Sequence, residues 1–184
     1  MLFLPIVGGP SIQTECTQYI KVNGQFSEGE VFCSGPGNLK CQIIIHAVGP
    51  VWQGGGNQEE DHLYLCIESA LKESENRNLS SIAIPALCTG IFGYPSKEAT
   101  KVICEAIKDY FKDNQASTVE TVYLCDIANK NVNLFEKAGN KFFDTDHSRK
   151  PVGGQQRDRF SGKNKYDSVL IFLVLLVTLN FCCL

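Results

Sequence analysis

The stretch Ile84–Pro95, IPALCTGIFGYP, contains two glycines, Gly90 and Gly93, that frame two large apolar residues, Ile91 and Phe92. A plain connector between two regular elements is polar and resembles Asn-Gly or Pro-Asp-Gly. Glycine permits the close approach of a backbone to another group. The stretch therefore predicts a loop that brings backbone N–H groups close to a ligand, with apolar side chains covering it.

The residues on either side of this stretch predict a strand before it and a helix after it. SIAIPAL (Ser81–Leu87) has the continuous apolar character of a buried strand. Ser96 suits a helix N-cap, and an apolar stripe at helical spacing follows it. A glycine-rich turn that leads into a helix suits a phosphate, because it gathers unpaired N–H groups at the positive end of the helix dipole. G-x-x-G also recurs by chance, so spacing alone leaves a tight connector open. The stripe is Ala99, Val102, Ile103, Ala106, Ile107, Tyr110 and Phe111.

Strands and helices alternate along the rest of the chain. We expect strands at Glu28–Ser34, Cys41–Val48 and Thr121–Ile127, and helices at about 59–75 and about 132–142. This alternation predicts an α/β domain with a largely parallel interior sheet. The chain opens on a helical pattern, in which Ile12, Cys16, Tyr19 and Ile20 share a face. An α/β domain that begins in a helix leads us to expect a sheet without its first strands.

Charge and cysteine usage limit the classes of partner. Residues 1–146 contain 11 basic and 18 acidic residues, which argues against non-specific binding along nucleic-acid backbones. We therefore expect no direct nucleic-acid partner. The nine cysteines include no CxxC pair and no Cys/His cluster with metal spacing, so we expect no metal site. Buried free thiols indicate a reducing compartment, the cytoplasm or the nucleus.

The carboxyl-terminal part of the chain differs from the rest. Residues 147–167 are polar and basic and read as a linker after a domain at 1–146. Residues 168–184 follow as an uncharged apolar segment, at the short edge of the roughly 20 residues that cross a bilayer. One interpretation is a transmembrane anchor, with the basic residues before it keeping the domain cytoplasmic. The other is a tail that never inserts in a membrane. Both stay open.

Several of these motifs, in this order, are similar to those of macrodomains, most of all the macrodomains of the macro-containing ADP-ribosyltransferases of animals. They are GGPSIQTEC (8–16), EGEVFCSGPGNLKCQIIIHAVGP (28–50) with Trp52 after it, SIAIPALCTGIFGYP (81–95) and VYLCDI (122–127). The resemblance covers about residues 5–145. It implies a three-layer α/β/α fold with a mixed sheet, and binding of free or protein-linked ADP-ribose without a further cofactor.

The resemblance also implies a role for the stretch Ile84–Pro95. It implies that Thr89, Gly90, Ile91, Phe92 and Gly93 form the second phosphate-cradling loop of the family, with Phe92 near the ribose next to the diphosphate. We include Cys88, which directly precedes the loop, among the expected ligand-binding residues.

Some motifs of the family have no counterpart in this sequence. In the family, an Asp that holds the adenine, an Asn that holds the second ribose and a glycine-rich first loop precede the position of Leu2. We therefore expect a partial macrodomain that lacks the first strands. Catalysis in this family relies largely on groups in the first loop, so we expect a module that recognises ADP-ribose, with no catalytic residue. A de-ADP-ribosylating hydrolase and a truncated, non-binding form remain alternatives.

Three further features have competing interpretations. Asp126 ends the strand VYLCD on the expected ligand side, where it approaches the adenosine or caps a turn or helix. His46, within the apolar run CQIIIHAV, is expected to be a hydrogen-bonded core residue and not a base. Gly54–Gly56, between VWQ and a polar stretch, is expected to be a flexible loop and not a phosphate site.

Overall fold

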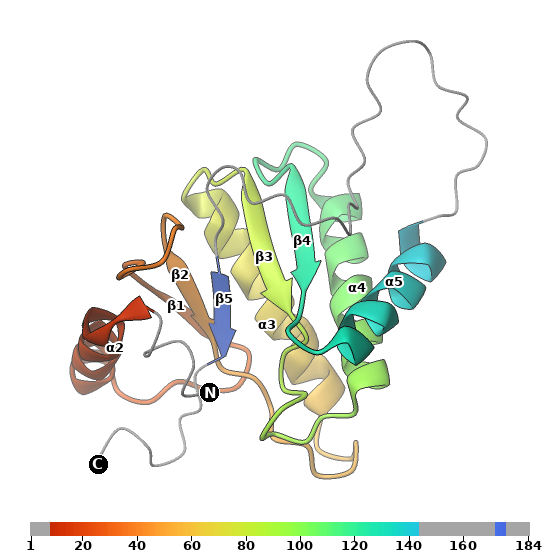
Figure 1. Cartoon of the computed structure of the whole chain (residues 1–184), viewed down its shortest axis with the longest axis horizontal. Coiled ribbons are helices and arrows are strands. Elements are labelled where there is room, and N and C mark those ends of the chain that lie inside the picture. Colours follow the sequence, from red (N-terminus) through yellow and green to blue (C-terminus); the bar gives the residue numbers. More distant parts are fainter. Residues whose placement is uncertain (1–7, 144–171, 176–184) are drawn as a thin grey trace.

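A computed structural model describes residues 8–143 and 172–175. Figure 1 shows a sheet of strands with helices packed on it. In chain order, the elements are α2 (Pro10–Asn23), β1 (Val31–Ser34), β2 (Ile44–Ala47), α3 (Glu59–Asn76), β3 (Ser81–Pro85), α4 (Ser96–Asp113), β4 (Thr121–Cys125), α5 (Asn129–Phe143) and β5 (Phe172–Leu175). All the expected strands and helices are present, and each expected strand is shortened at one or both ends.

The sheet is mixed and has the strand order β1-β2-β5-β3-β4. β1 runs antiparallel to β2, while β2, β5, β3 and β4 are parallel. The α/β class and the largely parallel interior are therefore confirmed. Because the four parallel strands run in one direction, their carboxyl ends meet at one edge of the sheet, the lower edge in Figure 1.

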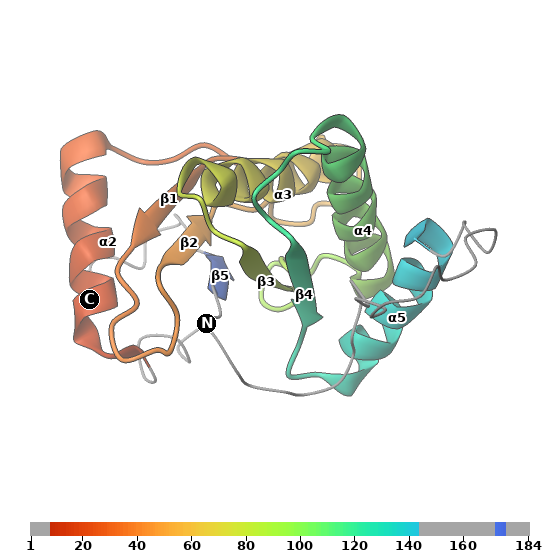
Figure 2. The ribbon, with the colours of Figure 1, turned by 90° about the horizontal axis from the view of Figure 1, so that it is seen from above.

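Side chains from the two faces of the sheet enter two separate apolar clusters. On β2, Ile45 and Ala47 belong to the larger cluster with α3 and α4, whereas Ile44 packs with Ile12 and Cys16 of α2. This alternation follows from the period of two in a strand, which sends neighbouring side chains to opposite faces. Helices thus cover both faces, as a three-layer fold requires. Figure 2 shows α2 beside β1 at one end of the molecule and α5 at the other.

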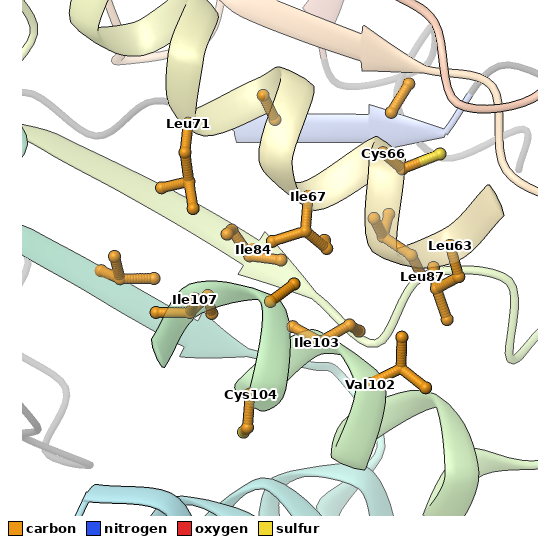
Figure 3. Close-up of a cluster of buried hydrophobic side chains, with 14 of the residues drawn as sticks. Leu63, Cys66, Ile67, Leu71, Ile84, Leu87, Val102, Ile103, Cys104 and Ile107 are labelled. Carbon is orange, nitrogen blue, oxygen red and sulfur yellow. The ribbon is translucent and has the colours of Figure 1, made fainter. Parts of the chain in front are cut away.

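The larger cluster confirms the helical stripes expected from the sequence. Leu63, Ile67 and Leu71 of α3 point toward Ile84 of β3 and toward Ile103 and Ile107 of α4 (Figure 3). All six side chains are buried. This packing fixes the end of β3, and with it the start of the loop that follows.

The apolar carboxyl-terminal segment contributes a strand to this sheet. Phe172–Leu175 lies between β2 and β3, in parallel register with Ile44–Ala47. These four residues are extended, which differs from the transmembrane helix that was one expectation for 168–184. They belong to the same sheet as β1, β2, β3 and β4, at an interior position between β2 and β3. The linker 147–167 and the other residues of 168–184 lie outside the described residues. Across the part of the chain that the structure describes, no helix is long and apolar enough to cross a membrane.

Candidate ligand-binding site

The candidate site is the loop that connects β3 to α4, which we call the 86–93 loop. It begins at the carboxyl end of β3, directly after Pro85, and leads through Tyr94 and Pro95 into α4. Ligands of open α/β sheets bind at this edge, outside the carboxyl ends of the strands. The topology therefore places the stretch Ile84–Pro95 where a ligand is expected.

Internal hydrogen bonds hold the 86–93 loop in a series of tight turns. The N–H of Tyr94 donates to the Cys88 carbonyl at 3.0 Å, and that of Gly93 donates to the Gly90 carbonyl at 3.0 Å. The backbone of Cys88 is left-handed, with a φ of 64°, and so is that of Gly93, with a φ of 69°. Left-handed backbone at a non-glycine residue is uncommon and is most often found where the surroundings hold it, as at binding sites. The shape of the loop is thus set before a ligand arrives.

The N–H groups of Gly90, Ile91 and Phe92 donate to no acceptor within residues 8–143 and 172–175. They are consecutive, and they lie shortly before the amino end of α4. Successive N–H groups of this kind form an anion-binding concavity, and the helix dipole adds a positive potential. The loop therefore offers several backbone donors to one anionic group.

The two glycines of the loop have different reasons to be glycine. Gly93 adopts a positive φ that side chains rarely tolerate. Gly90 does not, and a Cβ atom added to it would have no heavy atom within 4 Å. Neither backbone conformation nor packing within the described protein explains Gly90, and the space that a Cβ would occupy there is open. A ligand that contacts the backbone there would need that space.

The two apolar residues between these glycines point in opposite directions. Ile91 is 75% exposed, whereas Phe92 is 7% exposed and belongs to the core. The Phe92 carbonyl accepts a hydrogen bond from the backbone N–H of Trp52 at 2.9 Å. The Trp52 ring lies against the Tyr94 ring, with their centroids 4.6 Å apart. Phe92 therefore anchors the loop, and Ile91 is the apolar side chain available to cover a ligand. The expected contact of Phe92 with a ribose stays a prediction.

Asp126 joins the 86–93 loop to the turn between β4 and α5. Its Oδ2 accepts a hydrogen bond from the N–H of Ala86 at 3.3 Å, and its Oδ1 accepts one from the N–H of Ala128 at 2.8 Å. The second bond stabilises the turn that leads into α5, which was one of the two sequence interpretations. The expected approach of Asp126 to an adenosine stays a prediction.

Asn131 is a residue of the site that the sequence did not reveal. Its Nδ2 donates to the Thr89 hydroxyl at 3.3 Å, and that hydroxyl donates to the Ala86 carbonyl at 2.7 Å. Asn131 is only 7% exposed, and it lies in the first turn of α5, on the same side of the helix as the buried Phe135. A polar residue beside Val132 gives no sequence signal for such a contact, because the partner is brought close only by the sheet.

Cys88 carries no reactive thiolate. The side chain is buried, and burial, followed by the nearby Cys66 and Glu28, raises the pKa of its thiol far above the ordinary value. A protonated thiol is a poor nucleophile. Cys88 therefore contributes its backbone conformation to the loop.

A family model described as Macro domain matches residues 6–103 of this chain. The chain belongs to the macro domain family.

Individual relatives are similar to most of this chain. A human protein mono-ADP-ribosyltransferase, PARP14, is 33% identical over 139 residues, which confirms the resemblance to the animal enzymes; the match covers 73% of this chain and 8% of that protein. An uncharacterised protein of Thermotoga maritima is 35% identical over 130 residues, covering 71% of this chain and 22% of that protein. This chain thus spans a small part of the length of both relatives.

A solved macrodomain has the same fold. A single-residue variant of the Oceanobacillus iheyensis macrodomain, solved with ADPR, superposes with a TM-score of 0.70 and 26% identity. The superposition covers 77% of this chain and 76% of that one. The macrodomain fold expected from the sequence is therefore confirmed.

The triple-glycine loop of this macro domain is not a second anion site. The carboxylate of Glu59, at the start of α3, accepts hydrogen bonds from the N–H groups of Gln53, Gly55 and Asn57 at 3.0, 3.1 and 2.6 Å. Burial alone would raise the pKa of this carboxyl, but the bonds from its own N–H, Gln53, Asn57 and Gly55 lower it to about 2. Glu59 thus already accepts hydrogen bonds from three backbone donors of this loop, and its negative charge opposes a phosphate there.

His46 is a core residue of the macro domain, as the sequence suggested. Its Nε2 lies 2.7 Å from the Ser34 hydroxyl, and its ring stacks on Phe32 with centroids 4.5 Å apart. Burial lowers the pKa of the imidazole to about 4. His46 is therefore neutral near pH 7, and it lies on the face of β2 that packs against α2 and not at the ligand edge. Among the described residues, no three His, Cys, Asp or Glu side chains cluster as metal ligands would.

Proposed function

We propose that this macro domain binds ADP-ribose, free or attached to a protein, and that the N–H groups of Gly90, Ile91 and Phe92 hold its diphosphate. The observation that carries the proposal is that these consecutive donors have no acceptor among the described residues, in a loop at the carboxyl edge of the sheet. The family supports the same ligand, because the Oceanobacillus iheyensis macrodomain has been solved with ADPR and with ADP.

The chemistry of the loop suits a diphosphate. Backbone donors bind an anion without a bulky side chain, so the phosphate comes close to the chain at Gly90, where a Cβ would have no neighbour. The exposed Ile91 side chain can cover an apolar face of the ligand, such as a sugar. The loop thus offers donors for the charge of the diphosphate, open space at Gly90 for its approach, and one apolar side chain, Ile91, for contact with the rest of the ligand.

Recognition without turnover is the activity we assign to this site. A hydrolase needs a group that activates water near the ribose. In the 86–93 loop, the Cys88 thiol is protonated, and the Thr89 hydroxyl already donates to the Ala86 carbonyl. Asp126, beside the loop, accepts two backbone hydrogen bonds. None of these groups is arranged as a general base, which favours a reader of ADP-ribose over an enzyme that removes it.

We place this reader in the cytoplasm or the nucleus. No disulfide is present among the described residues, and Cys66, Cys88 and Cys104 are buried thiols. Free thiols persist in a reducing compartment. The partners we propose there are proteins that carry ADP-ribose.

The test is calorimetric titration of the full chain with ADP-ribose, with adenosine as the control ligand. We expect saturable binding of ADP-ribose and none of adenosine, because adenosine lacks the diphosphate that the loop would hold. Equal binding of both ligands would contradict the assignment of the loop, and no binding of ADP-ribose by a folded chain would contradict the function. Incubation with an ADP-ribosylated protein separates reader from hydrolase, since a reader releases no ADP-ribose.

A further inference from the structure

The sheet of this protein consists of two halves that only β5 connects. β1 pairs with β2 in one half, and β3 pairs with β4 in the other. β5 lies between them and pairs with both β2 and β3 (Figure 1). Without β5, the facing edges of β2 and β3 would have no strand partner among the described residues.

These two facing edges are buried and apolar. The side chains of Ile44, Ile45 and Ala47 on β2, and of Ile82 and Ile84 on β3, have no exposed surface. A buried backbone N–H or C=O group without a partner costs free energy comparable to a lost hydrogen bond. The space between β2 and β3 therefore requires an extended backbone, and its surroundings favour an apolar sequence, as in the interior of parallel sheets.

The segment that supplies β5 meets this requirement. Phe172–Leu175 lies in the uncharged stretch 168–184, which contains no glycine or proline. Leucine, phenylalanine and valine suit a buried parallel strand. The sequence of this stretch thus gives it the properties of a strand for a dry interior position.

The attachment of β5 is nevertheless uneven. It has four register partners on β2, from Ile44 to Ala47, but a single partner on β3, Ala83, which faces Phe172. The chain between Phe143 and Phe172 is long, and closing a long connection costs conformational entropy. A short strand with one weak edge and a long connection opens at a lower free energy than the rest of a domain.

We propose that the space between β2 and β3 is a strand-acceptor site for a parallel apolar segment, and that Phe172–Leu175 of the same chain is its exchangeable occupant. The segment occupies the site because it belongs to the same chain, which makes its binding intramolecular. The segment leaves and re-enters while both halves of the sheet stay folded on α3 and α4. This proposal does not depend on the ligand of the 86–93 loop.

The first experiment tests the occupant and its register. Residues paired across a parallel sheet have Cα atoms about 4.8 Å apart, within the range that a disulfide spans. In the full chain, Ile45→Cys with Leu173→Cys places cysteines at Cα partners, and Ile45→Cys with Val174→Cys is one residue out of register. We expect an intramolecular disulfide, identified by mass spectrometry of the digest, at least about tenfold faster in the first variant. Equal rates, or links only between molecules in dilute solution, would overturn the proposal.

The second experiment tests exchange and does not depend on engineered cysteines. Proline cannot donate to a ladder, so Leu173→Pro should expel the segment, whereas Val169→Pro, in the same apolar stretch before β5, is the matched control. We expect exchange of the backbone amides of residues 44–47 and 81–84 to speed up about tenfold or more in Leu173→Pro only. A peptide of residues 169–177, with lysines added at its ends for solubility, should restore protection in that variant. Unchanged protection in Leu173→Pro, or no rescue by the peptide, would overturn the proposal.

Discussion

The side-chain amide of Asn131 donates a hydrogen bond to the Thr89 hydroxyl, 3.3 Å away, and so ties the first turn of α5 to the loop after β3. Asp126 makes a second tie between the same two segments through the N–H of Ala86. The 86–93 loop is therefore held from outside by the β4–α5 turn, as well as by its own internal turns. Residues outside the 86–93 loop can then control how well the loop binds a ligand.

Replacing Asn131 tests this brace. In Asn131→Ala the Thr89 hydroxyl loses its donor but keeps its bond to the Ala86 carbonyl, so we expect a loss of about 1 kcal/mol in the free energy of unfolding. The loosened loop should bind ADP-ribose several-fold more weakly. Urea unfolding and calorimetry measure the two effects. Asn133→Ala, on the exposed side of the same helix, should change neither, and an equal effect there would argue against the brace.

A side chain at Gly90 should block the proposed anion site without harming the fold. A Cβ at Gly90 meets no atom, so Gly90→Glu should change the unfolding free energy by about 0.5 kcal/mol or less. Its side chain and negative charge would enter the space before the free N–H groups and weaken ADP-ribose binding at least about tenfold. Thermal melting with roughly 100-fold excess over Kd detects this, because such an excess stabilises a binder by about 2.7 kcal/mol.

The matched control for that variant is Gly56→Glu. Gly56 also has no atom within 4 Å of an added Cβ and no positive φ, but it lies in the loop in which the Glu59 carboxylate accepts hydrogen bonds from Gln53, Gly55 and Asn57. We expect Gly56→Glu to keep the full ligand-induced stabilisation. Loss of binding in both variants would point to a general charge effect, and retention in both would remove the 86–93 loop from the site.

His46 should make the protein less stable as the solution becomes mildly acidic. Burial lowers the pKa of its imidazole from 6.5 to about 4. Between these values the unfolded chain binds the proton and the folded one does not, so stability falls as pH falls from 6.5 toward 4 and is independent of this group above about pH 7. The loss amounts to up to about 3 kcal/mol. Urea unfolding from pH 7.5 to 4.5 measures it, and the slope should vanish in His46→Gln. A slope that persists in this variant would assign it to other groups.

Glu59 should determine how the stability of the protein changes with pH at lower pH values than His46 does. Its pKa is lowered from 4.5 to about 2, so its stabilising effect is complete above pH 4.5 and disappears as pH falls through 2. Glu59→Gln should therefore melt at a lower temperature than the parent at pH 7, and the gap should close between pH 4.5 and 2. Calorimetric melting at several pH values follows it. Glu60→Gln, at the exposed neighbouring position, should leave the curve unchanged, and parallel curves for Glu59→Gln would contradict the role of the charge.

The sequence by itself determined much of the fold and the location of the site. The stripe of α3 and the runs CQIIIHAV and SIAIPAL predicted their elements, because burial imposes a period of 3.6 residues on a helix and an apolar run on an interior strand. Gly90 and Gly93 marked the loop, because glycine requirements are local to the backbone. The macro domain family could likewise be recognised from motifs along the chain.

Only the tertiary structure decided the long-range relationships. No sequence pattern connects Asn131 with Thr89, or Phe172–Leu175 with β2 and β3, because each pair meets across the sheet. The apolar stretch 168–184 suited a membrane helix on hydropathy alone, and hydropathy does not distinguish a bilayer from a dry protein interior. For Phe172–Leu175, the difference lies in the backbone hydrogen bonds. The edges of β2 and β3 offer partners to an extended chain, whereas a bilayer core offers none. Such edges exist only after the rest of the chain has folded.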